Sequence, residues 1–281
     1  MAVRNGLSVD VEDWFQVGAF ETTIARGDWE GLERRVEANT DRVLALFEAA
    51  GVQGTFFTLG WVAERHPRLI RRIAEAGHEV ASHGWDHARV FTLTPGQFRE
   101  DLARARVALE DAAGVAVNGY RAPSFSIDRR TPWAHAVLAE AGYCYSSSIA
   151  PIAHDHYGWP DAPRTPFRPL PDARLIELPI TIARVLGREV TAGGGFFRLL
   201  PQRVTERAIR AANGGDEAAM FYFHPWEIDP GQPRVHAAPL KSRLRHYARL
   251  GAMEGKLRTL LAAHDWGRVD AIAAEAAERL P

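Results

Sequence analysis

The sequence of 281 residues contains a single cysteine, Cys144. One cysteine excludes an intramolecular disulfide, and it also excludes a zinc site built from several thiolates. Methionine is nearly as scarce, with three residues, which excludes a methionine-rich binding surface. Any metal ion that this chain binds must therefore be held by histidine and carboxylate side chains.

An excess of charge of one sign is also lacking. The 34 Lys and Arg residues nearly balance the 35 Asp and Glu residues, and the formal net charge is −1. Because no basic stripe or Lys/Arg cluster stands out, we expect no nucleic-acid partner and no anionic membrane surface as a partner. No run approaches the roughly 20 apolar residues that cross a bilayer, so we expect no membrane span.

Residues 1–7 contain no apolar stretch long enough for a signal peptide. A cytoplasmic location is therefore the default expectation. A periplasmic location is expected instead if a targeting segment has been trimmed from the chain. The sequence pattern carries no signal for an oligomeric state.

Strand-like and helix-like segments alternate along the chain. The expected strands are 6–11, 54–59, 79–82, 118–122, 143–147, 175–179 and 219–223, and the expected helices are 32–50, 62–76, 94–113, 130–141 and 201–213. Strands separated by helices indicate βαβ units and a mainly parallel sheet. Six or seven such units favour an α/β barrel over an open sheet, with residues 1–239 as the barrel domain and residues 240–281 as a helical C-terminal extension.

Polar residues follow the ends of four expected strands, namely Asp10, His83, Arg121 and His224. In parallel α/β folds the ligand site lies at the carboxyl ends of the strands, so we expect these side chains to share one site. Two loops are expected beside it. Residues 149–174 contain six prolines and several aromatic residues, and the glycine-rich residues 191–197 can bring bare backbone close to a ligand.

Three carboxylates stand close together at the end of the first strand, in Asp10, Glu12 and Asp13. Acidic residues also occur at helix N-termini, where they offset the helix dipole, and these residues alone favour neither interpretation. The functional interpretation needs one carboxylate to bind a metal ion and another to take a proton from water.

His83 and His87 stand four positions apart, directly after the expected strand 79–82. This spacing lets both imidazoles bind one metal ion, in a helical turn or in a tight loop. Capping or surface histidines are the alternative, but a pair at this spacing with acids elsewhere indicates metal ligands. Two histidines and one carboxylate leave positions open for water and substrate. Zinc is our first choice for these donors, and cobalt, nickel or iron would fit the same site.

Two further motifs end expected strands. Arg121, followed by Pro123, can be a surface ion pair, or it can hold the base carboxylate by a bidentate contact and keep it ionised. His224, followed by Pro225, can be a core histidine. An imidazole that takes up a proton there would suit a general acid for a leaving amine.

Together these motifs resemble the polysaccharide deacetylases of carbohydrate esterase family 4, the NodB-homology group. The resemblance implies a distorted (β/α)7 TIM-like barrel that removes acetyl groups from N-acetylated sugars with the help of a metal ion. The family's first motif, an aspartate base followed closely by a carboxylate ligand, is similar to Asp10 with Glu12 or Asp13. The other motifs are similar to His83 with His87, Arg121 with Pro123, and His224.

The resemblance runs from about residue 5 to residue 227 and is closer still to a subgroup associated with bacterial exopolysaccharide loci. The segments that carry it are 9–14, 157–160, 193–198 and 245–247. The pattern Asp-x-Glu-Asp leaves the metal carboxylate open between Glu12 and Asp13. Gly84 replaces a hydroxyl residue of the family. Ser146 stands where relatives often have Asp, so the group that orients His224 must come from elsewhere.

The resemblance implies a metal-dependent hydrolase that acts on a linear amide, the N-acetyl group of an amino sugar in a polysaccharide or its precursor, within exopolysaccharide biosynthesis or modification. Asp10 would be the base, His224 the acid and Arg121 the residue that holds Asp10. Contacts with the N-acetylated oligo- or polysaccharide are expected from Pro123, Trp85, Tyr157, Trp159 and Trp226.

Two alternatives remain open from the sequence. Some relatives of this barrel cleave cyclic ureides or formamides, so the chain can be a small-molecule amidohydrolase, which a narrow closed pocket would favour. A non-catalytic glycan-binding protein of a polymer-export complex is the other. The intact set of Asp10, His83, His87 and His224 argues against a degenerate site of that kind.

Overall fold

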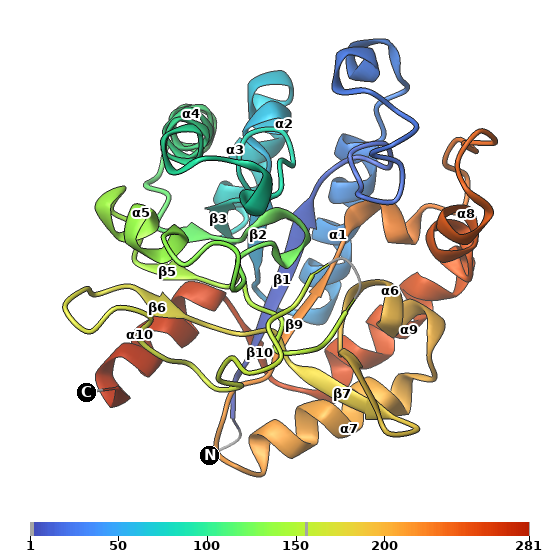
Figure 1. Ribbon diagram of the computed structural model, residues 1–281. Helices are drawn as coiled ribbons and strands as arrows, with labels where there is room; N and C mark the ends of the chain where they lie inside the picture. Colours follow the sequence, from blue (N-terminus) through green and yellow to red (C-terminus); the bar gives the residue numbers. More distant parts are fainter. Residues whose placement is uncertain (1–2, 155–156, 281) are drawn as a thin grey trace.

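The computed structural model describes residues 3–154 and 157–280. Its framework is a parallel β-sheet in which β1 pairs with three other strands (Figure 1). The strands of this sheet are β1 (Asn5–Val11), β2 (Thr55–Thr58), β3 (Glu79–Ser82), β4 (Gly119–Tyr120), β5 (Tyr145–Ser146), β6 (Ile176–Glu177), β9 (Met220–Phe223) and β10 (Trp266–Gly267). A separate antiparallel hairpin consists of β7 (Ile182–Val185) and β8 (Arg188–Thr191).

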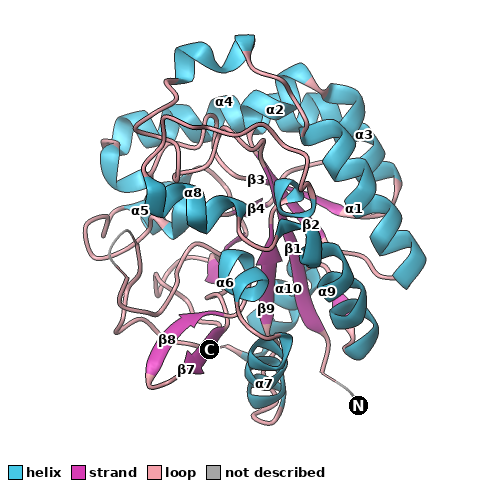
Figure 2. Ribbon diagram, turned by 90° about the vertical axis from the view of Figure 1, so that its right-hand side faces the viewer, coloured by secondary structure: helices cyan, strands magenta, loops and turns pink. Residues whose placement is uncertain are grey.

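Helices pack around the outside of the sheet (Figure 2). The α-helices are α1 (Val36–Ala50), α2 (Gly60–Arg65), α3 (Pro67–Glu75), α4 (Pro95–Ala113), α5 (Ala134–Glu140), α6 (Gly194–Leu199), α7 (Gln202–Asn213), α8 (Leu240–Tyr247), α9 (Leu250–Ala263) and α10 (Val269–Arg279). Short 3₁₀ helices span Arg26–Gly31, Val90–Thr92, Pro123–Phe125 and Pro225–Ile228.

The parallel sheet curls into a distorted barrel. Seven strands follow one another in the order β6, β5, β4, β3, β2, β1 and β9. Between the two outer strands, the backbone N–H of Thr181 donates to the Met220 carbonyl over 3.2 Å, and the Met220 N–H donates to Oγ1 of Thr181 over 2.7 Å. On that side of the barrel, these two hydrogen bonds take the place of regular backbone pairing between neighbouring strands. The expected distorted (β/α)7 barrel is confirmed.

The register of the strands brings their carboxyl ends to one edge. Val11 lies opposite Thr58, Thr58 opposite Ser82, and Ser82 opposite Tyr120. The residue that follows each strand therefore emerges beside the residue that follows its neighbour. All seven residues of β1 are buried, as expected for a central parallel strand covered on both faces.

Two of the expected helices illustrate what local sequence determines. The expected helix 94–113 is confirmed: Oγ1 of Thr94 accepts the Gln97 N–H, and Gly114 ends the helix in a left-handed conformation. The expected single helix 62–76 is wrong, because the chain breaks into α2 and α3 at His66. Pro67 has no N–H to continue a helix and instead occupies the first turn of the next one.

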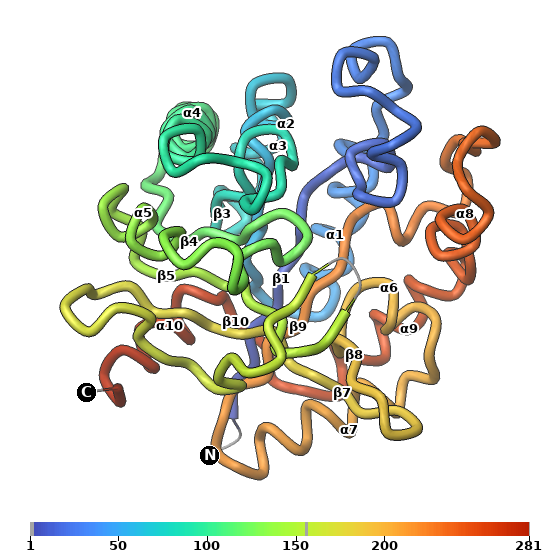
Figure 3. The backbone as a smooth tube through the Cα atoms, viewed as in Figure 1, coloured from blue at the N-terminus to red at the C-terminus, as the bar shows by residue number. Residues whose placement is uncertain are grey.

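The segment between β5 and β6 is irregular, as expected. Its described residues form no helix or strand, apart from an isolated bridge between Phe167 and Glu177. Figure 3 shows this segment as a long yellow-green trace that leaves the sheet and returns to it.

The glycine-rich segment 191–197 was expected to be a loop close to a ligand, and the structure corrects this in part. Its second half is the start of α6. A Cβ on Gly193 would lie 2.4 Å from the backbone oxygen of Tyr222, and one on Gly194 would lie 2.8 Å from the Tyr222 ring. Glycine is therefore needed here for close packing of α6 against β9, and only Gly195 of the three lines the cavity described below.

The C-terminal residues form the expected helices α8, α9 and α10, together with a strand that was not expected. In β10, Trp266 and Gly267 pair in parallel register with Asn5 and Gly6 of β1. The segment after α9 thus joins the central sheet, and both termini lie at the lower end of Figure 1. Among the described residues, no helix combines the length and the hydropathy needed to traverse a bilayer.

Candidate active site

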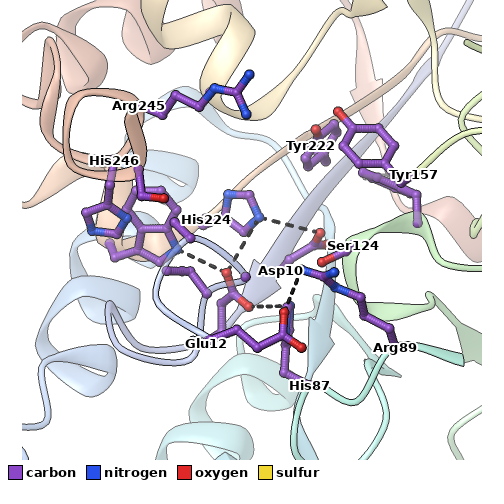
Figure 4. A pocket seen from close by; sticks show the side chains of 18 of the residues that line it. Asp10, Glu12, His87, Arg89, Ser124, Tyr157, Tyr222, His224, Arg245 and His246 are labelled. Carbon is purple, nitrogen blue, oxygen red and sulfur yellow. Dashed lines mark hydrogen bonds and ion pairs between the residues drawn. The ribbon is translucent and has the colours of Figure 1, made fainter. Parts of the chain in front are cut away.

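A cavity of about 600 Å³ opens at the carboxyl ends of the strands (Figure 4). Its lining includes Asp10, Glu12, His83, His87, Arg89, Ser124, Phe125, Tyr157, Tyr222, His224, Trp226 and Arg245. These side chains come from β1 and β9, from the loops after β1, β3, β4 and β9, from the segment after β5, and from α8. The register of the parallel strands therefore brings together residues from both ends of the chain.

A buried ion pair joins Asp10 and Arg121. Nη1 of Arg121 lies 2.6 Å from Oδ1 of Asp10, and both side chains are almost fully buried. The expected bidentate contact is not what the structure shows. Only Nη1 contacts the carboxylate, and it also donates to Oγ of Ser8 over 2.8 Å.

The remaining donors of Arg121 bind the turn after β5. Nε donates to the Ser147 carbonyl and Nη2 donates to the Ser147 hydroxyl, each over 3.0 Å. The guanidinium also lies 4.0 Å from the ring centroid of Phe57. Since every nitrogen of this fork has a partner, Arg121 has little rotational freedom, and it presents a fixed positive charge to Asp10.

Glu12, His83 and His87 form a cluster that can hold a metal ion. One potential ligand atom from each of the three lies within 4.8 Å of the other two. Nε2 of His87 lies 2.9 Å from Oε2 of Glu12, and this buried oxygen has no other polar partner among the described residues. A buried carboxylate oxygen whose only neighbouring partner is an imidazole, with a second imidazole close by, is a donor set that suits a divalent ion.

The protonation states in this cluster also suit a metal ion. Nδ1 of His83 donates to the Arg121 carbonyl over 2.8 Å, because a carbonyl oxygen can only accept, and Nε2 is left with its lone pair. Burial lowers the pKa of His83 to about 4, so the ring is neutral near pH 7. Burial alone would raise the pKa of Glu12, but the facing His87 outweighs it and lowers the pKa to about 2. The residues therefore offer a carboxylate and a neutral imidazole.

Asp13 lies away from this cluster. Its Oδ2 accepts the backbone N–H groups of Arg35 and Val36 over 2.8 and 3.0 Å, and its Oδ1 accepts the N–H of Trp14 over 2.9 Å. These bonds fasten the β1 loop to the start of α1. Of the two carboxylates left open by the sequence, the structure places Glu12 beside the histidines and gives Asp13 a backbone-capping position.

His224 faces the two carboxylates from the end of β9. Its Nε2 lies 3.9 Å from Oδ2 of Asp10 and 3.7 Å from Oε1 of Glu12, and its Nδ1 lies 3.2 Å from Oε2 of Glu227. Burial lowers the pKa of His224, but the hydrogen bond to Glu227 and the charges of Glu12 and Asp10 outweigh it and raise the pKa to about 9. The ring is therefore protonated near pH 7 in the absence of other cations.

The residues expected to contact substrate are only partly brought together. Tyr157 and Trp226 line the cavity. Pro123 is buried in the turn beside it, and the neighbouring Ser124 and Phe125 form the wall instead. Ser124 and Phe125 both have positive φ, which strains non-glycine residues and directs this turn toward the cavity.

Two of the expected tryptophans lie elsewhere, and we remove them from the substrate-binding residues. Trp85 packs under α4, where the Arg104 guanidinium stacks 3.5 Å from its ring centroid. Trp159 is half-buried against the core, and its backbone N–H donates to the Ala150 carbonyl. Both are apolar packing residues, an outcome that aromatic character alone does not distinguish from sugar stacking.

The sequence interpretation missed several residues of the site. Glu227 lies three positions after His224, a spacing that could have suggested a contact with it. Arg198 is fully buried behind Glu227, and no local pattern signals this. Arg89 and Arg245 reach the cavity from opposite sides in Figure 4; Arg89 pairs with Glu21 over 2.6 Å.

Two family models divide the chain between them. The model described as "Polysaccharide deacetylase" matches residues 28–146, and the model described as "Domain of unknown function (DUF3473)" matches residues 147–274. The first match contains His83, His87 and Arg121, whereas the second contains His224. The site is therefore assembled from both matched regions and from the strand before them.

Curated relatives match only part of this chain. A peptidoglycan deacetylase of Helicobacter pylori is 29% identical over 126 residues, which cover 45% of this chain and 40% of that protein. A peptidoglycan-N-acetylglucosamine deacetylase of Bacillus cereus is 29% identical over 96 residues, which cover 34% of this chain and 35% of that protein. The chain thus spans well under half the length of these relatives.

A solved structure matches nearly the whole chain. It is a putative polysaccharide deacetylase from Mycobacterium smegmatis, with a TM-score of 0.63 and 23% sequence identity. The match covers 99% of this chain and 93% of that one. At this identity the similarity shows a shared fold, and it extends through the region that the family model of unknown function covers.

Proposed function

This chain belongs to the polysaccharide deacetylase family, and we propose that it uses a divalent metal ion to hydrolyse the N-acetyl group of an amino sugar. The substrate would be a polysaccharide or its precursor. One observation carries the proposal. Asp10, which is paired with the buried Arg121 behind it, the Glu12–His83–His87 cluster and His224 face one another in a single cavity.

Glu12, His83 and His87 would hold the metal ion, and zinc is preferred, with cobalt, nickel or iron as alternatives. A divalent ion bound there would lower the pKa of water and polarise the acetyl carbonyl. The imidazole of His83 is held for this task by its bond to the Arg121 carbonyl.

Asp10 would act as the base. Its Oδ1 is engaged by Arg121, whereas its Oδ2 faces the cavity 3.9 Å from His224. The second oxygen accepts a proton from the attacking water, while the buried guanidinium holds the first oxygen in place. Attack on the acetyl carbon forms the new C–O bond of acetate.

His224 would act as the acid. Breaking the C–N bond releases an amine, which is a poor leaving group until its nitrogen receives a proton. Nε2 of His224 points to the same space as Oδ2 of Asp10, and it donates the proton to the departing nitrogen. The products are acetate and a free amino sugar, so the atoms of amide and water are accounted for.

We place the reaction in exopolysaccharide biosynthesis or modification, on the strength of the motifs at 9–14, 193–198 and 245–247. A cytoplasmic enzyme would act on a nucleotide-linked or lipid-linked precursor, and a periplasmic one on the polymer. Acetate release from UDP-N-acetylglucosamine and from a series of short N-acetylated oligosaccharides separates these substrates.

The decisive experiment combines metal content with turnover. We expect about one divalent ion per chain, its loss in the His83→Ala/His87→Ala variant, and release of acetate from N-acetylated oligosaccharides. Asp10→Asn should keep the metal and lose turnover. A protein that neither contains metal nor takes it up on reconstitution would refute the hydrolase and leave the glycan-binding alternative.

A further inference from the structure

His224 is oriented by a carboxylate from its own turn. Oε2 of Glu227 lies 3.2 Å from Nδ1 of His224 and accepts the His224 backbone N–H over the same distance. Since an ionised carboxylate only accepts hydrogen bonds, Nδ1 must carry a hydrogen. The other ring nitrogen, Nε2, is thereby directed to Asp10 and Glu12.

Glu227 is in turn held by Arg198. Nε of Arg198 lies 3.1 Å from Oε1 of Glu227, so the two oxygens of this carboxylate serve the arginine and the histidine separately. Glu227 is fully buried, and Arg198 is 1% exposed. A buried pair of this kind has few alternative geometries, because an unpaired charge there would be costly.

The remaining donors of Arg198 bind the end of α8. Nη1 donates to the carbonyls of His246 and Ala248 over 2.7 and 2.6 Å, and Nη2 donates to the Arg245 carbonyl over 2.8 Å. The last carbonyls of a helix have no partner within it. Arg198 satisfies three such groups and links the C-terminal segment to Glu227.

The helix that carries Arg198, α6, is itself held by a residue of the C-terminal segment. Lys256 of α9 donates from Nζ to the Leu200 carbonyl over 2.7 Å and also to the Phe197 carbonyl. These carbonyls lie at the end of α6. The helix is thus held from α9, while its arginine is held from α8.

We infer that Glu227 and Arg198 are the positioning residues of the acid step, and that α8 and α9 belong to the active site because they hold Arg198. The inference rests on the proposed function, in which His224 protonates the leaving amine. It gives a function to the region that the family model of unknown function matches. Glu227 also supplies the carboxylate that orients His224, which Ser146 cannot supply.

Leaving groups of different basicity provide the test. An N-acetylated oligosaccharide releases an amine that needs a proton, whereas 4-nitrophenyl acetate releases a phenolate that needs none. Both need the base and the metal. We expect Glu227→Ala to lower kcat on the oligosaccharide by about 10²-fold or more with KM within about threefold, and to change kcat on the ester less than about fivefold. Arg198→Met should follow the same pattern more weakly.

The controls separate positioning from folding. Glu79→Gln changes a buried glutamate at the start of β3, far from the cavity, and should leave both activities unchanged. Glu227→Gln keeps the size of the side chain but loses its charge, and it should fall between wild type and Glu227→Ala. Asp10→Asn should lose both activities. Circular dichroism and metal content should match wild type in every variant that is interpreted.

A measurement without turnover tests the same contact. In metal-free protein labelled with ¹⁵N-histidine, the Nδ1–H signal of His224, identified by its absence in His224→Gln, should be present in wild type and absent or shifted in Glu227→Ala. If wild type hydrolyses no substrate, the proposed function fails, but this spectrum still tests whether Glu227 holds Nδ1 of His224. An unchanged spectrum, or parallel losses on amide and ester, would overturn the inference.

Discussion

Nε1 of Trp226 donates a hydrogen bond to Oε1 of Glu12 over 3.1 Å. The Trp226 ring also stacks with His224, with centroids 5.2 Å apart, and with His246, with centroids 4.2 Å apart. One indole thus supports both the proposed metal carboxylate and the proposed acid. His246 is buried behind the indole, so the C-terminal helix α8 reaches the site by this route as well.

Trp226→Phe should weaken metal binding, because it removes the hydrogen bond to Glu12 and keeps an aromatic ring in the stack. Loss of a hydrogen bond to a side chain that binds the metal typically lowers the affinity for the metal about 10- to 100-fold. Competition for zinc with a chromophoric chelator measures this. Trp29→Phe is a matched control, since Trp29 is buried and its Nε1 has no hydrogen-bond partner among the described residues. Equal zinc affinity in the two variants would contradict the prediction.

Arg121→Met should destabilise the fold and abolish turnover. It leaves Asp10 as an uncompensated buried carboxylate, which costs about 3–5 kcal/mol in the free energy of unfolding. The double variant Asp10→Asn/Arg121→Met should regain part of that stability, because no buried charge is left alone, yet it should remain inactive.

Urea unfolding of the two single variants and the double variant provides the thermodynamic cycle. If the double variant is as unstable as the sum of the single ones, Asp10 and Arg121 do not act as a coupled pair.

Glu12→Gln and Asp13→Asn should have opposite effects. The first should remove most of the bound metal with little loss of stability, because it changes one of three proposed ligands. The second should keep the metal and lower stability by about 1–3 kcal/mol, because an amide cannot accept all the N–H groups of Trp14, Arg35 and Val36. Elemental analysis and urea unfolding on both proteins check this. If Asp13→Asn loses the metal and Glu12→Gln keeps it, the metal ligand is Asp13 and not Glu12.

Glu79 should make stability depend on pH between about 4.5 and 7. Burial and the nearby Asp270 raise the pKa of Glu79 from 4.5 to about 7 in the folded chain. The folded state therefore holds this proton more tightly than the unfolded state. The stabilisation that comes from the proton on Glu79 is complete below pH 4.5 and is lost as the pH rises through 7. It amounts to about 3 kcal/mol, at about 1.4 kcal/mol per pH unit.

Glu79→Gln cannot titrate, so its free energy of unfolding should fall less than that of wild type over this window. Urea unfolding at several pH values across the window gives both slopes. Equal slopes would show that Glu79 does not carry a raised pKa.

Several parts of the fold and the site followed from local sequence. The seven strands of the barrel, β1 to β6 and β9, were expected from local sequence, whereas β7, β8 and β10 were not. Helix 94–113 had its capping residues at both ends. His83 and His87 were recognisable as a pair from their spacing after a strand, and the structure places both within reach of one ion. Where local signals conflicted, as at Pro67, the expected helix was wrong.

Other parts depended on contacts across the chain. Glu12 and Asp13 are neighbours of the same charge, and the choice between them depends on backbone N–H groups at residues 35 and 36, which only folding brings near. Trp85 and Trp226 are both buried tryptophans, but one lies under α4 and the other beside Glu12. The strand β10 has only two residues, too few for any periodicity to show.

The sequence by itself indicated the alternation of strands and helices, the edge of the sheet that carries the site, and the kinds of side chain available there. Apolar periodicity and the chemistry of each side chain are local properties, so they can be recognised without knowing the fold. Only the tertiary structure decided which carboxylate joins His83 and His87, and that Arg198 and Glu227 orient His224. Those assignments depend on short distances between segments far apart in the chain, and such distances are set by packing.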